Sequence, residues 1–209
     1  MRRAVFLDRD GVLNRLVARD GQSVSPRRLA EFALLPGVRP AVAALQRASL
    51  LVIVVTNQPD LARGALAPAE LERMHDRLLK AVPIDAIYAC PHDDRNGCTC
   101  RKPNPGLLRR ASLDWNIHLE TSFLVGDTWK DIAAGKAAGC ATIQVAATLG
   151  VPVGVAADFM VPDLPAAAEI ILGELERRRE TRAGSQGRAP KPKGTAAALA
   201  RGADNAIEL

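Results

Sequence analysis

The sequence predicts an α/β fold in which helices cover both faces of a parallel sheet. Short runs of β-branched and apolar residues alternate along the chain with longer helical stretches, a pattern typical of parallel α/β proteins. Residues 51–55 are apolar at every position, as expected for a central strand that is covered on both faces. Polar motifs follow the predicted strands, where ligands bind in open α/β sheets. Together these observations predict a Rossmann-like sheet with a site at one edge.

The predicted elements follow from local patterns. The expected strands are the short apolar runs, in order Ala4–Leu7, Leu50–Thr56, Ile84–Ala89, Ser122–Val125, Ala141–Val145 and an edge strand at Phe159–Val161. The expected helices are Arg39–Ala48, Pro68–Lys80, Pro105–Asp114, Trp129–Ala138 and Asp163–Arg179. Gly37 and Pro40 mark the start of the first helix, and Pro68 starts the second. Residues 15–36 form a long connection, and loops of that length are often functional.

Composition and charge predict one globular domain with a basic tail. The 209 residues are 48% hydrophobic and 24% charged, ordinary values for a single soluble domain, which we place at residues 1–180. Residues 177–209 hold eight Lys and Arg against three acidic residues, so the formal charge of +5 lies in this end of the chain. We expect residues 181–209 to be a disordered, solvating tail rather than a nucleic-acid-binding segment.

Nothing in the sequence predicts a membrane or secretory protein. No apolar run approaches the roughly 20 residues of a membrane span, and the N-terminus leads directly into a short predicted strand. We therefore expect a cytoplasmic monomer with no membrane partner.

Two carboxylates at the end of the first strand are the most informative feature. Asp8 and Asp10 lie two residues apart, and a strand places such residues on one face. Gly11 lets the chain turn sharply after them. Paired carboxylate oxygens suit Mg²⁺, and an aspartate beside a bound cation can act as a phosphoryl-accepting nucleophile. Alone, the pair could also be two solvated acids at a strand end.

A cluster of cysteines predicts a second metal site. Cys90, His92, Cys98 and Cys100 supply three thiolates and one imidazole within a short segment, a complete tetrahedral set with no open position. We interpret this set as a structural Zn²⁺ site; free cysteines or a redox pair are the alternatives. Cys140 is expected to be a small core residue. His75 and His118 are expected to be surface residues.

Four polar motifs occur in order along the chain: residues 8–11 (DRDG), 56–58 (TNQ), 101–106 (RKPNPG) and 126–131 (GDTWKD). In this order they resemble the haloacid dehalogenase superfamily of phosphotransferases. The resemblance implies a Mg²⁺-dependent phosphomonoesterase without a large cap domain. Its catalytic residues would be Asp8, Asp10, Thr56 and Lys102.

The resemblance also implies a role for each residue. Asp8 would be the nucleophile that forms an aspartyl-phosphate, and Asp10 the general acid and base. Thr56 would hold a phosphoryl oxygen, and Lys102 would neutralise charge on the transferring group. Asp127 would bind Mg²⁺ with Asp8 and the backbone carbonyl of Asp10.

The resemblance also implies residues that position the catalytic groups or contact the substrate. Asp131 follows the metal aspartate by one helical turn and could orient the metal shell or the lysine. Substrate would contact the residues of two of the motifs, namely Thr56, Asn57, Gln58, Arg101 and Lys102. Arg101 is placed at the non-transferred end of the ligand, on a loop that zinc fixes.

The zinc loop narrows the resemblance to one branch of the superfamily. Residues 6–11, 55–58, 62–64, 90–92 and 100–103 resemble the branch of heptose-bisphosphate phosphatases and histidinol-phosphate phosphatase domains. This implies a small phosphorylated metabolite as substrate. The leading candidate is D-glycero-D-manno-heptose 1,7-bisphosphate, from which the enzyme would remove the 7-phosphate. Histidinol phosphate, a nucleic-acid end, or a catalytically silent zinc-stabilised binding module are the alternatives. A kinase is disfavoured because the chain has no Gly-x-x-x-x-Gly-Lys-Ser/Thr loop.

Overall fold

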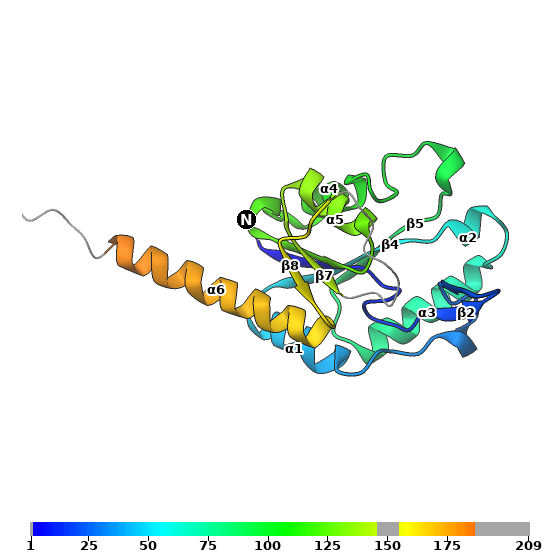
Figure 1. The fold of residues 1–209 in the computed structure, drawn as a ribbon, viewed down its shortest axis with the longest axis horizontal. Coiled ribbons are helices and arrows are strands. Elements are labelled where there is room, and N and C mark those ends of the chain that lie inside the picture. Colours follow the sequence, from blue (N-terminus) through cyan, green and yellow to red (C-terminus); the bar gives the residue numbers. More distant parts are fainter. Residues whose placement is uncertain (1, 146–154, 187–209) are drawn as a thin grey trace, which may run out of the picture. The chain divides into compact units, whose positions relative to one another are not determined.

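The computed structural model describes residues 2–145 and 155–186, and these form the parallel α/β architecture that the sequence predicts (Figure 1). The six strands of the main sheet run in the order β5-β4-β1-β6-β7-β8, and every neighbouring pair is parallel. Their bounds are β1 Ala4–Leu7, β4 Leu51–Asn57, β5 Ala86–Cys90, β6 Phe123–Gly126, β7 Ala141–Val145 and β8 Phe159–Val161. The helices are α1 Val38–Arg47, α2 Pro59–Ala62, α3 Pro68–Ala81, α4 Gly106–Trp115, α5 Trp129–Ala138 and α6 Leu164–Gln186.

The order of the strands brings the separate motifs to one edge of the sheet. Strand β1 lies between β4 and β6, and Leu7 at its end pairs with Val54 on one side and Val125 on the other. The chain segments that follow these three strands therefore leave the sheet side by side, at its carboxyl edge. This is the edge at which open α/β sheets bind ligands.

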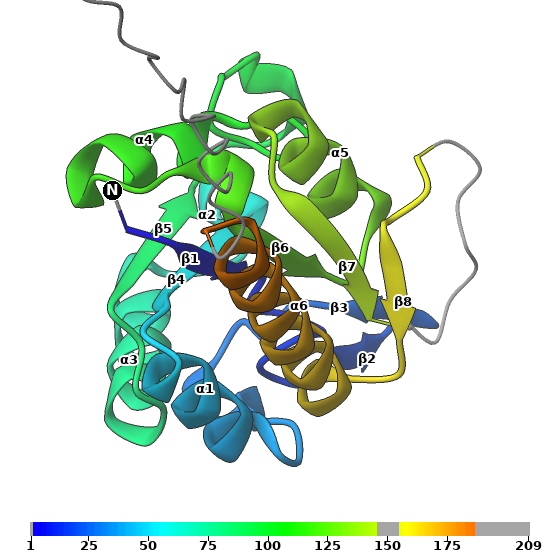
Figure 2. The ribbon, with the colours of Figure 1, turned by 90° about the vertical axis from the view of Figure 1, so that its left-hand side faces the viewer.

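Two layers of helices cover the sheet, as Figure 2 shows. Alternate residues of β1 face opposite layers because successive side chains of a strand point to opposite faces. Val5 and Leu7 pack in one core with residues of α1, α3 and the first part of α6. Ala4 and Phe6 pack in the other core with residues of α4 and α5. Cys140 is 5% exposed in this second core, which confirms the prediction that it is a core residue.

Several element boundaries differ from the predicted ones by one or two residues. β4 continues to Asn57 and β5 to Cys90 because these two residues pair with each other. β5 begins at Ala86 rather than Ile84, after Asp85 has accepted a hydrogen bond from the backbone of Val52 (2.7 Å). β6 likewise ends at Gly126 rather than Val125.

The long connection at residues 15–36 contains structure that its pattern did not predict. Strands β2 (Val17–Arg19) and β3 (Gln22–Val24) form a small antiparallel hairpin, with Asp20 and Gly21 at positive φ in its turn. A short 3₁₀ helix, η1 (Leu29–Glu31), follows. Two further 3₁₀ turns are η2 (Asp94–Asn96) and η3 (Leu119–Thr121).

Residues Met1–Leu175 form one compact unit, which contains the whole sheet, and a second unit begins at Glu176. Helix α6 continues to Gln186, so the prediction that it ends at Arg179 was wrong. Residues 181–186, expected to belong to the disordered tail, are helical. The rest of the predicted tail, residues 187–209, lies outside the described residues. Among the described helices, none is long and apolar enough to span a membrane.

Candidate active site

The carboxylates after β1 and β6 meet in one buried acidic cluster. Carboxylate oxygens of Asp8, Asp127 and Asp131 all lie within 4.8 Å of one another. Burial and the neighbouring negative charges raise the pKa of Asp8 to about 7 and that of Asp127 to about 8, although Lys102 opposes both shifts. Oδ1 of Asp127 is buried without a hydrogen-bond partner. Such a set of hard oxygens fits a Mg²⁺ ion.

The resemblance placed the backbone carbonyl of Asp10 at the metal, and the carboxylate of this residue lies outside the acidic cluster. Its oxygens accept four hydrogen bonds from Arg9, Asn14 and Gln58. Burial would raise its pKa, but the charge of Arg9 and these hydrogen bonds outweigh burial and lower it. Asp8 and Asp10 nevertheless line the same cleft. The two carboxylates thus share one cleft, but the pKa of Asp8 is raised and that of Asp10 is lowered.

Two glycines make the acidic cluster possible. Gly11 has φ +85°, and a Cβ there would lie 2.2 Å from Oδ2 of Asp127. A Cβ on Gly126 would lie 2.1 Å from the Cβ of Asp131. A larger residue at position 11 would displace the carboxylate of Asp127, and one at position 126 would displace Asp131. Both positions therefore require glycine.

Lys102 is the cation that faces the acidic cluster. Its side chain is 2% exposed, and its Nζ lies 2.9 Å from Oδ1 of Asp8 and 2.5 Å from Oδ1 of Asp131. The ammonium also donates to the backbone carbonyl of Val55 (2.8 Å). Burial alone would lower the pKa of Lys102, but the charges of Asp131 and Asp8 raise it above its usual value. The lysine therefore remains charged beside the predicted nucleophile.

Asp131 and Asn57 fix this lysine in place. Asp131 accepts hydrogen bonds at Oδ2 from the backbone and hydroxyl of Thr128 (3.1 and 2.6 Å), while its Oδ1 faces Lys102. Asn57 accepts from the backbone N–H of Lys102 (3.1 Å) and donates to its carbonyl (3.0 Å). From the sequence, Asp131 was expected to orient either the metal shell or the lysine. The structure gives it a direct contact with the lysine.

Gln58 and Thr56 connect the end of β4 to Asp10. Nε2 of Gln58, which is 1% exposed, donates to Oδ2 of Asp10 (2.8 Å) and to Oγ1 of Thr56 (2.9 Å). Thr56, Asn57 and Gln58 all line the cleft, as predicted for substrate-contacting residues. The amides of Asn57 and Gln58, however, hold Lys102 and Asp10 respectively.

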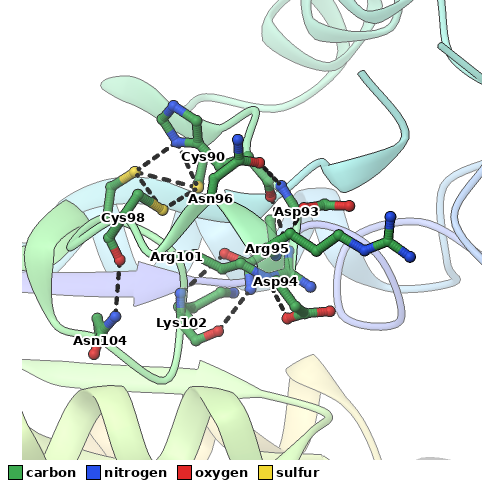
Figure 3. Close-up of polar contacts among 12 residues, drawn as sticks. Cys90, Asp93, Asp94, Arg95, Asn96, Cys98, Arg101, Lys102 and Asn104 are labelled. Atoms are coloured by element: carbon green, nitrogen blue, oxygen red, sulfur yellow. Dashed lines mark hydrogen bonds and ion pairs between the residues drawn. The ribbon is translucent and has the colours of Figure 1, made fainter. Parts of the chain in front are cut away.

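The predicted zinc ligands also come together. The three sulfur atoms of Cys90, Cys98 and Cys100 lie 3.2–3.7 Å apart, and Nδ1 of His92 lies 3.6 Å from the sulfur of Cys90 and 3.3 Å from that of Cys100 (Figure 3). A tetrahedral zinc ion with Zn–S bonds of 2.3 Å requires sulfur atoms about 3.8 Å apart, so the four groups fit such an ion with small adjustments. All four cysteines of the chain are free, which excludes a disulfide in this structure.

Arg101 follows the zinc cluster directly and is tied to the same loop. Its Nε donates to Oδ1 of Asp94 (2.8 Å) and its Nη1 to the carbonyl of His92 (3.3 Å). Figure 3 shows Arg101 and Lys102 beside the loop that carries Asp93 and Asp94. The zinc loop therefore holds the base of the segment that presents Lys102 to the acidic cluster.

A cleft of about 420 Å³ opens over these residues. Its inner part contains the acidic cluster, Asp10 and Lys102, and residues 22–27, which are strand β3 of the hairpin and the segment after it, form one wall. Three arginines line its outer part, each paired with an acid: Arg27 with Asp60 (2.6 Å), Arg63 with Asp60 (3.6 Å) and Arg101 with Asp94 (2.8 Å). The hairpin and these paired arginines give the cleft walls that a small anionic ligand can contact.

The prediction that His75 is a surface residue was wrong. Helix α3 turns this residue inward, and its Nε2 lies 3.2 Å from Nη1 of Arg9. Arg9, which lies between the two aspartates of the DRDG motif in the sequence, is fully buried. Its role was missed because only the acidic residues of this motif were considered as functional. The position of Arg9 between two predicted catalytic carboxylates was a signal that it contacts one of them. No sequence pattern links Arg9 to His75.

Comparison with known proteins identifies the family. Residues 99–164 match the family described as HAD-hydrolase-like. D-glycero-beta-D-manno-heptose-1,7-bisphosphate 7-phosphatase of Bordetella bronchiseptica is 39% identical over 142 residues, 66% of this chain and 76% of that protein. The protein of that name from Escherichia coli K12 is 33% identical over 184 residues, 82% of this chain and 89% of its own length.

Solved structures agree with these relatives. The crystal structure of D,D-heptose 1,7-bisphosphate phosphatase from B. bronchiseptica complexed with magnesium and phosphate has a TM-score of 0.70 and 36% identity, covering 82% of this chain and 99% of that one. The corresponding phosphatase from Burkholderia thailandensis has a TM-score of 0.56 and 30% identity, with coverage of 82% and 99%. The chain is a phosphatase and belongs to the haloacid dehalogenase-like hydrolases, in the family that includes these heptose bisphosphatases.

Proposed function

We propose that this enzyme is a Mg²⁺-dependent phosphomonoesterase that removes the 7-phosphate of D-glycero-D-manno-heptose 1,7-bisphosphate. One observation carries the proposal: an acidic cluster and a buried lysine share a cleft with a rim of arginines. The acidic cluster, with Lys102 and a bound Mg²⁺ ion, would bind the phosphate that is transferred. The arginines at the rim of the cleft would bind the second phosphate. The similarity to heptose bisphosphatases over most of the chain supports this substrate.

Asp8 serves as the nucleophile in this proposal. A carboxylate oxygen of Asp8 attacks phosphorus, and the bond from phosphorus to the sugar oxygen breaks. Asp10 protonates that oxygen, so the sugar leaves as an alcohol. Asp10 then accepts a proton from the water that hydrolyses the aspartyl-phosphate. The first step uses the protonated form of Asp10 and the second its carboxylate, and the lowered pKa of Asp10 favours the carboxylate.

Asp8, Asp127 and the backbone carbonyl of Asp10 would hold Mg²⁺, whose charge offsets the repulsion between a carboxylate and a phosphate. The ammonium of Lys102, held by Asp131, contacts the transferring phosphoryl group. The hydroxyl of Thr56 holds one phosphoryl oxygen. Asp131 thus acts through the lysine, because both of its oxygens are engaged by Lys102 and Thr128.

Cys90, His92, Cys98 and Cys100 bind Zn²⁺ in this proposal, as the closed set of three sulfurs and one nitrogen indicates. The zinc loop keeps Lys102 and Arg101 in position and takes no part in the reaction. The proposal also includes a cytoplasmic, monomeric enzyme that has a small metabolite as its only partner.

A panel of phosphorylated metabolites assayed with Mg²⁺ tests the substrate. We expect kcat/KM for heptose 1,7-bisphosphate to exceed that for histidinol phosphate by at least about 100-fold, and release of phosphate from C7 with the 1-phosphate retained. The arginine rim would account for the difference through charge-assisted hydrogen bonds to the second phosphate. Faster turnover of histidinol phosphate, or of a phosphorylated nucleic-acid end, would replace the proposed substrate. No turnover of any phosphate ester would favour a silent binding module.

A further inference from the structure

The buried guanidinium of Arg9 holds the carboxylate of Asp10 along its full width. Arg9 is 0% exposed, and its Nε and Nη2 donate to the two oxygens of Asp10 at 3.1 and 3.0 Å. This two-point contact fixes both the position and the plane of the carboxylate. Asn14 donates one further hydrogen bond to Oδ1 of Asp10 and Gln58 one to Oδ2, so each of these residues contacts a single oxygen.

Helix α3 in turn holds Arg9 through His75. Nε2 of His75 lies 3.2 Å from Nη1 of Arg9, on the side of the guanidinium away from Asp10. Among the described residues, Asp10 is the acid that pairs with Arg9, and the carbon of the guanidinium lies 5.9 Å from the ring centre of Phe32. Burial, and secondly the charge of Arg9, lower the pKa of His75 to about 4. The imidazole is therefore neutral near pH 7 and accepts a hydrogen bond from the arginine.

We propose that Arg9 and His75 are positioning residues that keep Asp10 in the orientation required for proton transfer to the leaving group. The inference rests on the proposed role of Asp10 as general acid. Transfer requires the acid within about 2.6–3.2 Å of the leaving oxygen, and a displacement of 1 Å can lower the rate by about 100-fold. The neutral imidazole fixes Arg9 without competing for Asp10, since a protonated one would repel the guanidinium.

The dependence of kcat/KM on the leaving group measures this role. This parameter covers the steps up to departure of the alcohol, in which Asp10 gives its proton as the phosphorus–oxygen bond breaks. An alkyl phosphate needs that proton, whereas an aryl phosphate with an acidic phenol leaves without it. We expect Asp10→Asn and Arg9→Met each to lower kcat/KM for alkyl phosphates by about 10²–10⁴-fold, and for p-nitrophenyl phosphate by less than about 10-fold.

A matched pair at position 75 tests the second part of the inference. His75→Gln keeps an acceptor oxygen for Arg9, whereas His75→Leu fills similar space without one. We expect the Gln variant to remain within about 3-fold of wild type on every substrate. The Leu variant should lose about 10-fold on alkyl phosphates and little on p-nitrophenyl phosphate. If Arg9→Met fails to fold, this pair decides the question alone.

The outcomes separate the inference from the proposed function. If Asp10→Asn lowers the rate equally for alkyl and aryl esters, Asp10 is not the general acid and both fail. If Asp10→Asn is selective but Arg9→Met is not, only the inference about Arg9 is overturned. Equal behaviour of the Leu and Gln variants would remove His75 from the arrangement and overturn its part.

Discussion

The acidic cluster and the zinc cluster are both sets of candidate metal ligands, but they are built in different ways. Asp8 and Asp127 follow two strands far apart in the sequence, Asp131 lies in the first turn of α5, and all three face a cleft. The four zinc ligands come from an eleven-residue segment, residues 90–100, and form a closed set. The first cluster lines a cleft and faces the ammonium of Lys102. The second has the full ligand number of a structural zinc ion.

We expect the acidic cluster to serve catalysis and the zinc cluster to serve the stability of the fold. Carboxylates that repel one another raise the free energy of the folded protein, and in the proposed mechanism this site binds a cation and a phosphate. In the proposed zinc site, the closed thiolate–imidazole set would stabilise the loop that carries Lys102 without contacting substrate. Changes in the acidic cluster should therefore affect turnover more than folding, and changes in the zinc cluster should do the reverse. The following predictions can break or sharpen that contrast.

Substituting Asp8 should have the largest effect on activity. Asp8→Asn replaces the attacking oxygen with an amide, and we expect kcat to fall by more than about 1,000-fold. Because the change also removes one of three repelling carboxylates, the melting temperature in the absence of Mg²⁺ should stay the same or rise. Steady-state kinetics and thermal unfolding measure both quantities. Activity above a thousandth of wild type would exclude Asp8 as the nucleophile.

Lys102→Met should also reduce turnover severely, by about 10²–10³-fold, because the transferring phosphoryl group loses its buried cation. The loss should be similar for alkyl and aryl phosphates, since both transfer the same group. This uniformity distinguishes the lysine from Arg9, whose replacement should affect mainly alkyl esters. A loss confined to bisphosphates would move Lys102 to the rim of the cleft.

Removing a zinc ligand should act on stability first. Cys98→Ser opens the closed set, and we expect the free energy of unfolding to fall by about 3 kcal/mol or more, because metal binding contributes to folding. Metal analysis of the wild type should give one zinc atom per chain. Cys140→Ser is the matched control, since Cys140 lies outside the cluster. Absence of zinc, with four titratable thiols, would contradict the assignment.

Arg101→Ala should have a smaller and more selective effect. We expect kcat/KM to fall by about 10–100-fold for heptose 1,7-bisphosphate and by less than 3-fold for p-nitrophenyl phosphate, which has no second phosphate. Arg101 is paired with Asp94 in this structure, so Asp94→Asn should leave the arginine more available. Equal loss on both substrates would place Arg101 at the transferred phosphate.

The smallest expected effect is a pH-dependent stabilisation by Mg²⁺. The pKa values of Asp8 and Asp127, about 7 and about 8 in the folded protein, lie above their ordinary value of 3.8. The folded state therefore binds more protons than the unfolded state between about pH 4 and 8, and metal-free stability should fall as pH rises through this range. Mg²⁺ should raise the melting temperature more at pH 8 than at pH 5. An equal shift at both pH values would mean that the ion binds elsewhere.

The sequence predicted those parts of the molecule that depend on local patterns. The six strands follow from short apolar runs, and the zinc ligands from their close spacing. The β2–β3 hairpin was missed because three-residue strands in a polar connection lack a hydrophobic period. The contact of His75 with Arg9 was missed because it depends on how α3 packs against the end of β1.

Within the site, the sequence identified residues more readily than their contacts. The motifs marked Asp8 and Asp127, and the fold brings both to one point because β1 and β6 are neighbours. The motifs could not show that Asp131 bridges Lys102 and Thr128, or that Asn57 holds the backbone of the lysine. These hydrogen bonds depend on side-chain geometry, which residue type and spacing leave open.

The most direct test of the central claim is to trap the covalent intermediate. The enzyme would be mixed with heptose 1,7-bisphosphate and Mg²⁺, quenched in acid within milliseconds and digested for mass spectrometry. We expect one phosphoryl group on Asp8, formed and lost at rates that account for kcat, and none in Asp8→Asn or without Mg²⁺. Phosphate on another residue, or complete turnover with no phosphorylated enzyme at any time, would contradict the account.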